Sequence, residues 1–185
     1  KSGVGEEDST ETVRATIYRR FEDGVPLTVV TRVQLNISGR AREISLGKIL
    51  LADTVPTKID SSLPVRLPPE GDVSVFVRPG THEVFITAAV IKPLQTVLVP
   101  APTPNFYDAE EVWVWVPNEQ VRSVRINGLN DVDPERTSLP ADWRGHATYL
   151  VVRENKMSIA ETRRGMVEPS PNMLKLSREL WLDLD

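Results

Sequence analysis

Residues 27–38 alternate between two kinds of side chain, and this alternation limits the folds open to the chain more than any other feature. One set is almost entirely apolar and consists of Leu27, Val29, Thr31, Val33, Leu35 and Ile37. Successive side chains of a β-strand point to opposite faces, so a period of two predicts a strand with one buried and one solvent-exposed face. A similar run from Glu11 to Phe21 precedes it across the turn residues 22–24. The two runs together predict a long antiparallel hairpin.

The rest of the chain has the same strand-forming character. Val, Ile and Thr account for 47 of the 185 residues, and 15 prolines and 10 glycines interrupt them. β-branched residues favour strands, whereas proline is poorly tolerated inside helices. Strand-like runs recur about every ten residues with turns between them, and residues 73–77 and 84–91 are expected to form a second hairpin. We therefore predict an all-β fold, specifically an antiparallel, jelly-roll-like β-sandwich of two sheets.

The length of the chain suits one domain with a substantial core. Residues 1–10 are polar and acidic and are predicted to be a disordered lead-in, which leaves residues 11–185 as a single β-sandwich domain. Residues 93–106 contain four prolines, which predicts an extended connector or an edge strand. This connector is the candidate for a seam between sub-domains, and two small sandwiches joined near Pro100 are the alternative. The last residues, 173–185, are predicted to be a strand, so we expect the chain to be an excised piece of a longer protein.

Composition excludes several classes of function. The chain has no Cys and only two His, so cysteine-based zinc sites, iron–sulfur sites, disulfides and thiol nucleophiles are ruled out. A net charge of −4 argues against non-specific nucleic-acid binding, which needs a concentrated basic surface. No phosphate-binding loop or dinucleotide fingerprint is present, so no cofactor is predicted. No run of 18 apolar residues occurs, so this segment is not expected to insert into a membrane.

Two tryptophans form the most distinctive candidate site. Trp113 and Trp115 lie two residues apart in a predicted strand and so share one face, with Glu111 expected on the opposite face. Paired indoles near a carboxylate are suited to hold sugar rings, and Trp143 is a further candidate for such a platform. The alternative is that another segment covers the pair, either the 93–106 connector or the C-terminal strand with Trp181.

Acidic residues suggest two other kinds of site. Asp131, Asp133 and Glu135 alternate in a loop, as calcium ligands do, but they lack the pattern of an EF-hand. We predict no metal site there, and the alternative reading is a capped turn with Asp133 as the cap and Pro134 in the first position. A glycoside hydrolase needs two facing carboxylates, for which the chain offers Asp108, Glu110, Glu111, Asp142 and Glu179. Nothing beyond the acids supports that activity, so we predict that the chain is not an enzyme.

Three stretches resemble a known group of sequences: residues 110–115 (EEVWVW), 133–144 (DPERTSLPADWR) and 176–185 (LSRELWLDLD). The series resembles a segment of long, uncharacterised envelope proteins of Gram-negative bacteria, over residues 12–185. That group has no activity to carry over, so the resemblance implies no site residues. It implies an extracytoplasmic, periplasmic location and a role inside a larger polypeptide.

These observations lead to two hypotheses of function. The first is a non-enzymatic interaction or scaffold module of a larger bacterial envelope protein. Its partners would be other domains of the same polypeptide or another envelope protein. The alternative is a carbohydrate-binding module that uses Trp113 and Trp115 as a platform for envelope glycan.

Overall fold

The computed structural model describes residues 11–68, 71–100 and 104–165, which form strands, turns and two single turns of 3-10 helix. The strands are β1 (Thr12–Glu22), β2 (Thr28–Ser38), β3 (Arg42–Gly47), β4 (Thr54–Ser61), β5 (Val65–Arg66), β6 (Val73–Val77), β7 (Gly80–Val90), β8 (Thr96–Leu98), β9 (Glu110–Val116), β10 (Arg122–Asn127), β11 (Asn130–Asp131), β12 (Ala147–Val152) and β13 (Lys156–Arg164). The helical turns are η1 (Pro134–Arg136) and η2 (Ala141–Trp143). Neither helical turn in these ranges is long and apolar enough to cross a membrane. The predicted lead-in at 1–10 and the predicted strand at 173–185 lie outside the described residues.

Seven strands form one large sheet in the order β11-β12-β9-β1-β2-β7-β4. β1 and β2 pair antiparallel along their whole length, which confirms the predicted hairpin. On its other side β1 pairs with β9 in parallel, with Tyr18 opposite Val112. The remaining pairs of this sheet are antiparallel, so the sheet is mixed rather than purely antiparallel. Its strands come from both sides of the proline-rich connector, because β9 and β12 follow residues 93–106 in the chain.

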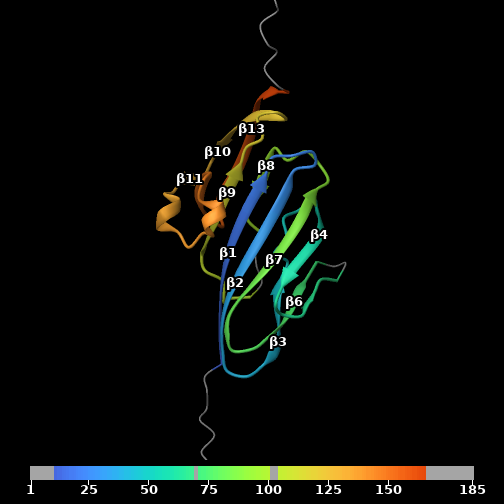
Figure 1. Ribbon diagram of the computed structural model, residues 1–185, viewed down its shortest axis with the longest axis vertical. Coiled ribbons are helices and arrows are strands. Elements are labelled where there is room, and N and C mark those ends of the chain that lie inside the picture. Colours follow the sequence, from blue (N-terminus) through green and yellow to red (C-terminus); the bar gives the residue numbers. More distant parts are fainter. Residues whose placement is uncertain (1–10, 69–70, 101–103, 166–185) are drawn as a thin grey trace, which may run out of the picture.

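Two small sheets form the second layer of the molecule. The sheet β3-β6-β5 lies towards the lower end of the large sheet in Figure 1, and β10-β13-β8 lies at the upper end. Both pack on the same face of the large sheet, where side chains of the two layers share hydrophobic clusters. The all-β sandwich is therefore confirmed, with a second layer divided into two sheets instead of one.

The inner face of the large sheet carries two separate hydrophobic clusters. Every second residue of β1 points inward, and the series reads Ala15, Ile17, Arg19 and Phe21. The lower core, under β3-β6-β5, consists of Ala15, Ile17, Val33, Leu35, Ile37, Leu46, Ile49, Leu63, Val73, Val75, Val77, Val84 and Ile86. The upper core, under β10-β13-β8, consists of Phe21, Leu27, Val29, Leu51, Val90, Val97, Trp113, Trp115, Val151, Met157 and Ile159. The inward positions between the two clusters are polar, namely Arg19 on β1 and its cross-strand partner Thr31 on β2.

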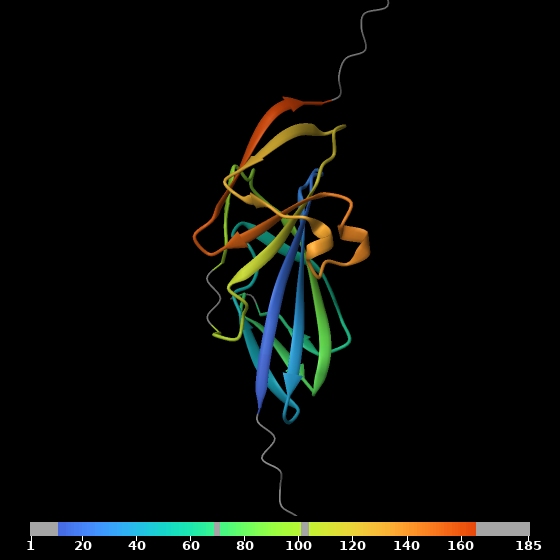
Figure 2. The ribbon, with the colours of Figure 1, turned by 90° about the vertical axis from the view of Figure 1, so that its left-hand side faces the viewer.

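The outer face of the large sheet is covered only in part. The loop with the helical turns η1 and η2, orange in Figure 2, projects from this face. Leu139 and Trp143 from this loop pack on side chains of the sheet in a third cluster. The sheet side chains of that cluster are Tyr18, Val30, Val112 and Val114. Val112 and Val114 thus face this outer cluster, on the opposite side of β9 from Trp113 and Trp115.

Two strand predictions need correction. The expected hairpin of residues 73–77 and 84–91 is wrong, because β6 belongs to the small sheet β3-β6-β5 whereas β7 lies between β2 and β4 in the large sheet. The turn at residues 78–79 thus carries the chain from one layer to the other. β4 was not anticipated by the sequence reading, although Val55, Thr57 and Ile59 alternate and Pro56 marks an edge strand. The 93–106 connector contains the edge strand β8, as one of its two readings predicted.

Gly128 offers a direct test of how tightly β10 and β13 meet. Its φ is +85°, and a Cβ there would lie 2.2 Å from the backbone oxygen of Lys156. We expect Gly128→Ala to lower the free energy of unfolding by about 2 kcal/mol or more, because both the backbone conformation and the contact oppose a side chain. Gly145 has open space and no left-handed φ, so Gly145→Ala should stay within about 0.5 kcal/mol of the parent chain. Urea unfolding of both variants measures the difference, and equal stabilities would contradict the described packing.

Candidate functional site

Trp113 and Trp115 are buried, which excludes the exposed platform and agrees with the alternative that another segment covers the pair. Their exposed fractions are 1% and 4%. Both rings contact Phe21, with ring centroids 5.2 and 6.1 Å apart. The connector covers them, because Val97 of β8 lies in the same cluster with Leu94 and Val99 packed against it. The two tryptophans are therefore part of the upper core and cannot receive a sugar ring at the surface.

Glu111 lies on the same face of β9 as the tryptophans, and the expectation of the opposite face is wrong. Residues 111, 113 and 115 are separated by two positions, so the period of a strand places all three on one side. The indole Nε1 of Trp113 donates a hydrogen bond to Glu111 Oε2 at 2.7 Å. Arg19 donates to the same carboxylate from Nε at 2.7 Å and from Nη2 at 3.1 Å. This carboxylate is thus fully engaged inside the protein.

The Arg19–Glu111 pair forms a polar layer between the lower and upper cores. The side chain of Arg19 is completely buried and that of Glu111 is 8% exposed. Arg19 Nη1 also donates to Thr31 Oγ1 at 3.1 Å and to the backbone oxygen of Ile49 at 2.8 Å. A buried cation needs such a complete set of partners, because an unpaired charge in the interior is strongly unfavourable. The layer ties β1, β2 and β9 to the loop after β3, which is a structural role.

Tyr107 borders this polar layer and is a hydrogen-bond donor rather than an acid. Its hydroxyl donates to the backbone oxygen of Leu46 at 2.8 Å. Burial raises the pKa of Tyr107 well above its usual value, and the nearby positive charge of Arg19 offsets this only in part. The phenol is therefore neutral at all physiological pH values.

Trp143 is 2% exposed and belongs to the outer cluster rather than to a binding platform. It lies in η2, at the last position of that helical turn. The guanidinium carbon of Arg20 lies 5.0 Å from the centre of its ring, close enough for a cation–π contact. This contact holds the loop on the large sheet, so Trp143 has no face free for a ligand.

The acidic run 131–135 forms a capped turn. Asp133 Oδ1 accepts a hydrogen bond from the backbone N–H of Glu135 at 3.0 Å, and Pro134 starts η1, which confirms the capping prediction. Glu135 forms an ion pair with Arg144 at 3.0 Å. Within the described ranges no three metal-ligating side chains come together, and Asp131 lies on β11. This part of the structure thus offers no assembled cation site.

Three of the five acids considered for glycoside hydrolysis are paired with arginines, and Glu110 is exposed at the start of β9. Asp108 lies 2.9 Å from Arg14, and Asp142 lies 3.3 Å from Arg20. Glu111 is buried with Arg19, and Glu179 lies outside the described residues. A hydrolytic pair needs two carboxyl groups facing one cleft. The described residues do not bring these acids together in that way.

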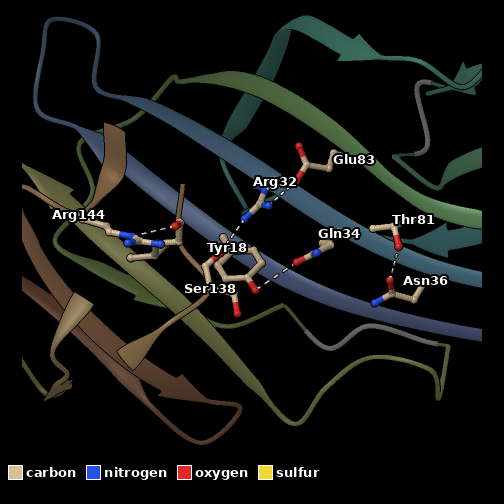
Figure 3. A network of polar contacts seen from close by, with 9 residues as sticks. Tyr18, Arg32, Gln34, Asn36, Thr81, Glu83, Ser138 and Arg144 are labelled. Atoms are coloured by element: carbon tan, nitrogen blue, oxygen red, sulfur yellow. Dashed lines mark hydrogen bonds and ion pairs between the residues drawn. The ribbon is translucent and has the colours of Figure 1, made fainter. Parts of the chain in front are cut away.

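A network of polar side chains clamps the helical loop to the outer face (Figure 3). Arg32 of β2 lies over the ring of Tyr18, 4.7 Å from its centroid, and forms an ion pair with Glu83 of β7. Its Nη1 donates to the backbone oxygen of Ser138 at 3.2 Å, which fixes the loop between η1 and η2. Further along the sheet Thr81 donates to Asn36 at 2.9 Å. The polar groups of this network bind one another, so the network holds the loop on the sheet and is not a reactive site.

A groove beside β4 is the surface best suited to hold a ligand. It encloses about 600 Å³ next to the outermost strand of the large sheet. Its lining consists of Lys48, Leu50, Leu51, Thr54, Pro56, Thr57, Lys58, Ile59, Leu67, Pro68 and Gly71. Among these residues the charged ones are the two lysines, and the rest are mainly apolar. We call this feature the β4 groove.

Exposed apolar side chains accompany the β4 groove. Val55 and Ile59 of β4 are 46% and 40% exposed. Lys58 lies 3.6 Å from Asp60, but both side chains are 70% exposed, so that pair is weak and Lys58 remains available to a partner. The groove combines residues from three separated parts of the chain, 48–51, 54–59, and 67–68 with Gly71, and no local sequence signal predicts their meeting.

Comparison with known proteins adds little to these observations. No protein-family model matches the sequence, and no curated protein matches it. Two solved structures show a distant likeness in shape. One is a mutant of a two-domain M1 zinc metallopeptidase bound to L-tryptophan, with 12% identity and a TM-score of 0.43. The other is an M1 zinc metallopeptidase from Deinococcus radiodurans, with 10% identity and a TM-score of 0.41.

Both likenesses cover 82% of this chain but only 43% of the metallopeptidase chain. The chain thus spans less than half the length of these structures. With TM-scores below 0.5 we draw nothing about function from them.

Proposed function

We propose that this chain is a non-enzymatic interaction module that binds an extended polypeptide segment in the β4 groove. The observation that carries the proposal is the groove itself, an apolar surface with two lysines beside an exposed edge strand. Exposed apolar surface of this kind is typical of interaction sites. Lysines at its border favour a partner with acidic as well as apolar side chains.

The other described features support an interaction role over a catalytic one. The buried carboxylate of Glu111 is bound by Arg19 and Trp113, so it is not free to act as an acid or base. We do not propose the carbohydrate-binding alternative, because Trp113 and Trp115, its expected platform, lie in the upper core. The larger envelope polypeptide and the periplasmic location are part of this proposal and rest on the sequence resemblance.

A peptide titration followed by NMR tests this function. We expect a ten-residue peptide of alternating Leu and Asp to cause saturable shift changes at residues 50–59, whereas a Leu and Lys peptide should not. Lys48→Glu/Lys58→Glu should weaken binding of the acidic peptide by about tenfold, because two attractive charge contacts become repulsive. Lys156→Glu, an exposed lysine on β13, is the matched control and should bind as the parent chain does.

Three results would contradict the proposal. Equal shifts with both peptides would show that charge plays no part. Shifts unaffected by Lys48→Glu/Lys58→Glu would show that the peptide binds elsewhere. A parallel titration with glycans should produce no saturable change, and glycan binding that leaves the groove signals unmoved would replace this function with another.

A further inference from the structure

We infer that the occupant of the β4 groove is the C-terminal segment of the same chain, residues 176–185. This inference rests on the proposed function, since it requires that the groove bind an extended peptide. The segment reads LSRELWLDLD and ends in alternating apolar and acidic residues. The groove and this segment therefore have complementary chemistry within a single molecule.

The alternation at the end of the segment matches the two kinds of residue in the groove. In an extended chain Leu180, Leu182 and Leu184 share one face, and Trp181, Asp183 and Asp185 share the other. The leucines suit the apolar floor formed by Leu50, Ile59 and Leu67 and their neighbours. The two carboxylates suit Lys48 and Lys58, the charged side chains among the described lining residues.

The segment is long enough to reach the groove from its point of attachment. The last described residue, Gly165, donates its backbone N–H to the oxygen of Val121 at 2.9 Å, which fixes where the segment starts. With residues 176–185 in the groove, the tether is residues 166–175, which can span about 33 Å when extended. Arg164 and Val90 line one surface hollow, and Val90 pairs with Thr54 at the start of β4, so the tether begins near that end of the strand. β4 has eight residues and is about 27 Å long, so the groove is within reach.

Attachment to the same chain favours this occupant over a separate molecule. A tethered segment meets its site at an effective concentration in the millimolar range, so even a weak contact is well populated. The backbone edge of β4 is poorly suited to indiscriminate strand pairing, because Pro56 has no N–H and a bulge interrupts the register between Pro56 and Lys58. Recognition then depends on the side chains of the groove, which is what the leucines and aspartates match.

A charge-swap experiment in the full chain tests the inference. Three variants are compared with the parent chain: Lys48→Glu/Lys58→Glu, Asp183→Lys/Asp185→Lys, and the combination of all four changes. The probe is acrylamide quenching of Trp181, because the other three tryptophans are 1–4% exposed and contribute little. A Trp181→Phe chain gives the background that is subtracted.

We expect each double variant to raise the quenching constant of Trp181 by about two- to threefold, because charge reversal lowers the docking equilibrium constant by about tenfold. The variant with all four changes again has opposite charges on the groove and the segment, so its quenching constant should return to the parent value. Glu168→Lys, a reversal outside residues 176–185, is the control and should change nothing. The parent value should also be the same at 1 and 50 µM chain. The inference is overturned if the charge reversals leave the quenching constant of Trp181 unchanged. It is also overturned if the protection of Trp181 grows with chain concentration, because the groove is then occupied by a second copy.

Adding the Leu and Asp peptide to the same chains separates this inference from the proposed function. If the C-terminal segment occupies the groove, the peptide binds Asp183→Lys/Asp185→Lys about tenfold more tightly than it binds the parent chain. Equal binding to these two chains, with loss in Lys48→Glu/Lys58→Glu, would leave the proposed function standing and overturn the inference. Binding to none of the chains would overturn both.

Discussion

Arg19→Met lowers the free energy of unfolding by about 3–5 kcal/mol, because it leaves the buried carboxylate of Glu111 without its cation. The side chain of Arg19 is completely buried and donates to Glu111, Thr31 and the backbone oxygen of Ile49. The replacement has a similar length and is apolar, so the loss reports the unpaired partners more than a cavity. Urea unfolding followed by circular dichroism measures it.

Two further variants isolate the charge. Arg19→Met/Glu111→Leu should recover part of the loss, since it removes the uncompensated carboxylate. Recovery stays incomplete because Thr31 and the N–H of Trp113 still lack their partners. Arg14→Met, at a side chain 74% exposed and paired with Asp108, should change stability by no more than about 1 kcal/mol. Arg19→Met with as small an effect as Arg14→Met would show that the polar layer is not buried as described.

The sequence predicted those features that depend on neighbours in the chain. The hairpin of β1 and β2 follows from two alternating runs with a turn between them, and the cap of η1 follows from Asp133 and Pro134. Both are local, since a strand period and a capping side chain act within a few residues.

The features that were missed depend on contacts between distant parts of the chain. The parallel pairing of β1 with β9 joins residues about 94 positions apart, as Tyr18 and Val112 show, and no turn signal announces it. The chain moves from one sheet to another between β6 and β7, because β7 pairs with β2. The adjacent runs 73–77 and 84–91 had instead predicted that these two segments pair with each other. The β4 groove unites three segments for the same reason.

The candidate site also combines features that the local sequence predicts with features that depend on distant parts of the chain. The sequence correctly placed the two tryptophans on one face of a strand, but their burial depends on Leu94, Val97 and Val99 from the connector. The position of Glu111 was predictable, because the spacing from Trp113 is two residues and a strand keeps such residues on one side. Its buried partner Arg19 was not, since 92 residues separate them.

Trp113→Ala is expected to lower the free energy of unfolding by about 3–5 kcal/mol, because it leaves a large cavity in the upper core. Trp113 is 1% exposed, contacts Phe21 and donates to Glu111, so its loss removes packing and a charged hydrogen bond together. A variant made to abolish glycan binding would instead unfold in part. Thermal and urea unfolding of Trp113→Ala measure this effect.

A comparison of two conservative variants isolates the hydrogen bond from the packing. Trp113→Phe removes the N–H donated to Glu111, which costs about 1.5–3 kcal/mol in addition to lost volume, because the acceptor is charged. Trp115 Nε1 is buried and has no acceptor among the described residues, so Trp115→Phe loses volume but no hydrogen bond. Trp113→Phe should therefore be the less stable of the two in urea. If Trp115→Phe is instead equally or more destabilised, the bond between Trp113 and Glu111 contributes nothing, and the polar layer is held by Arg19 alone.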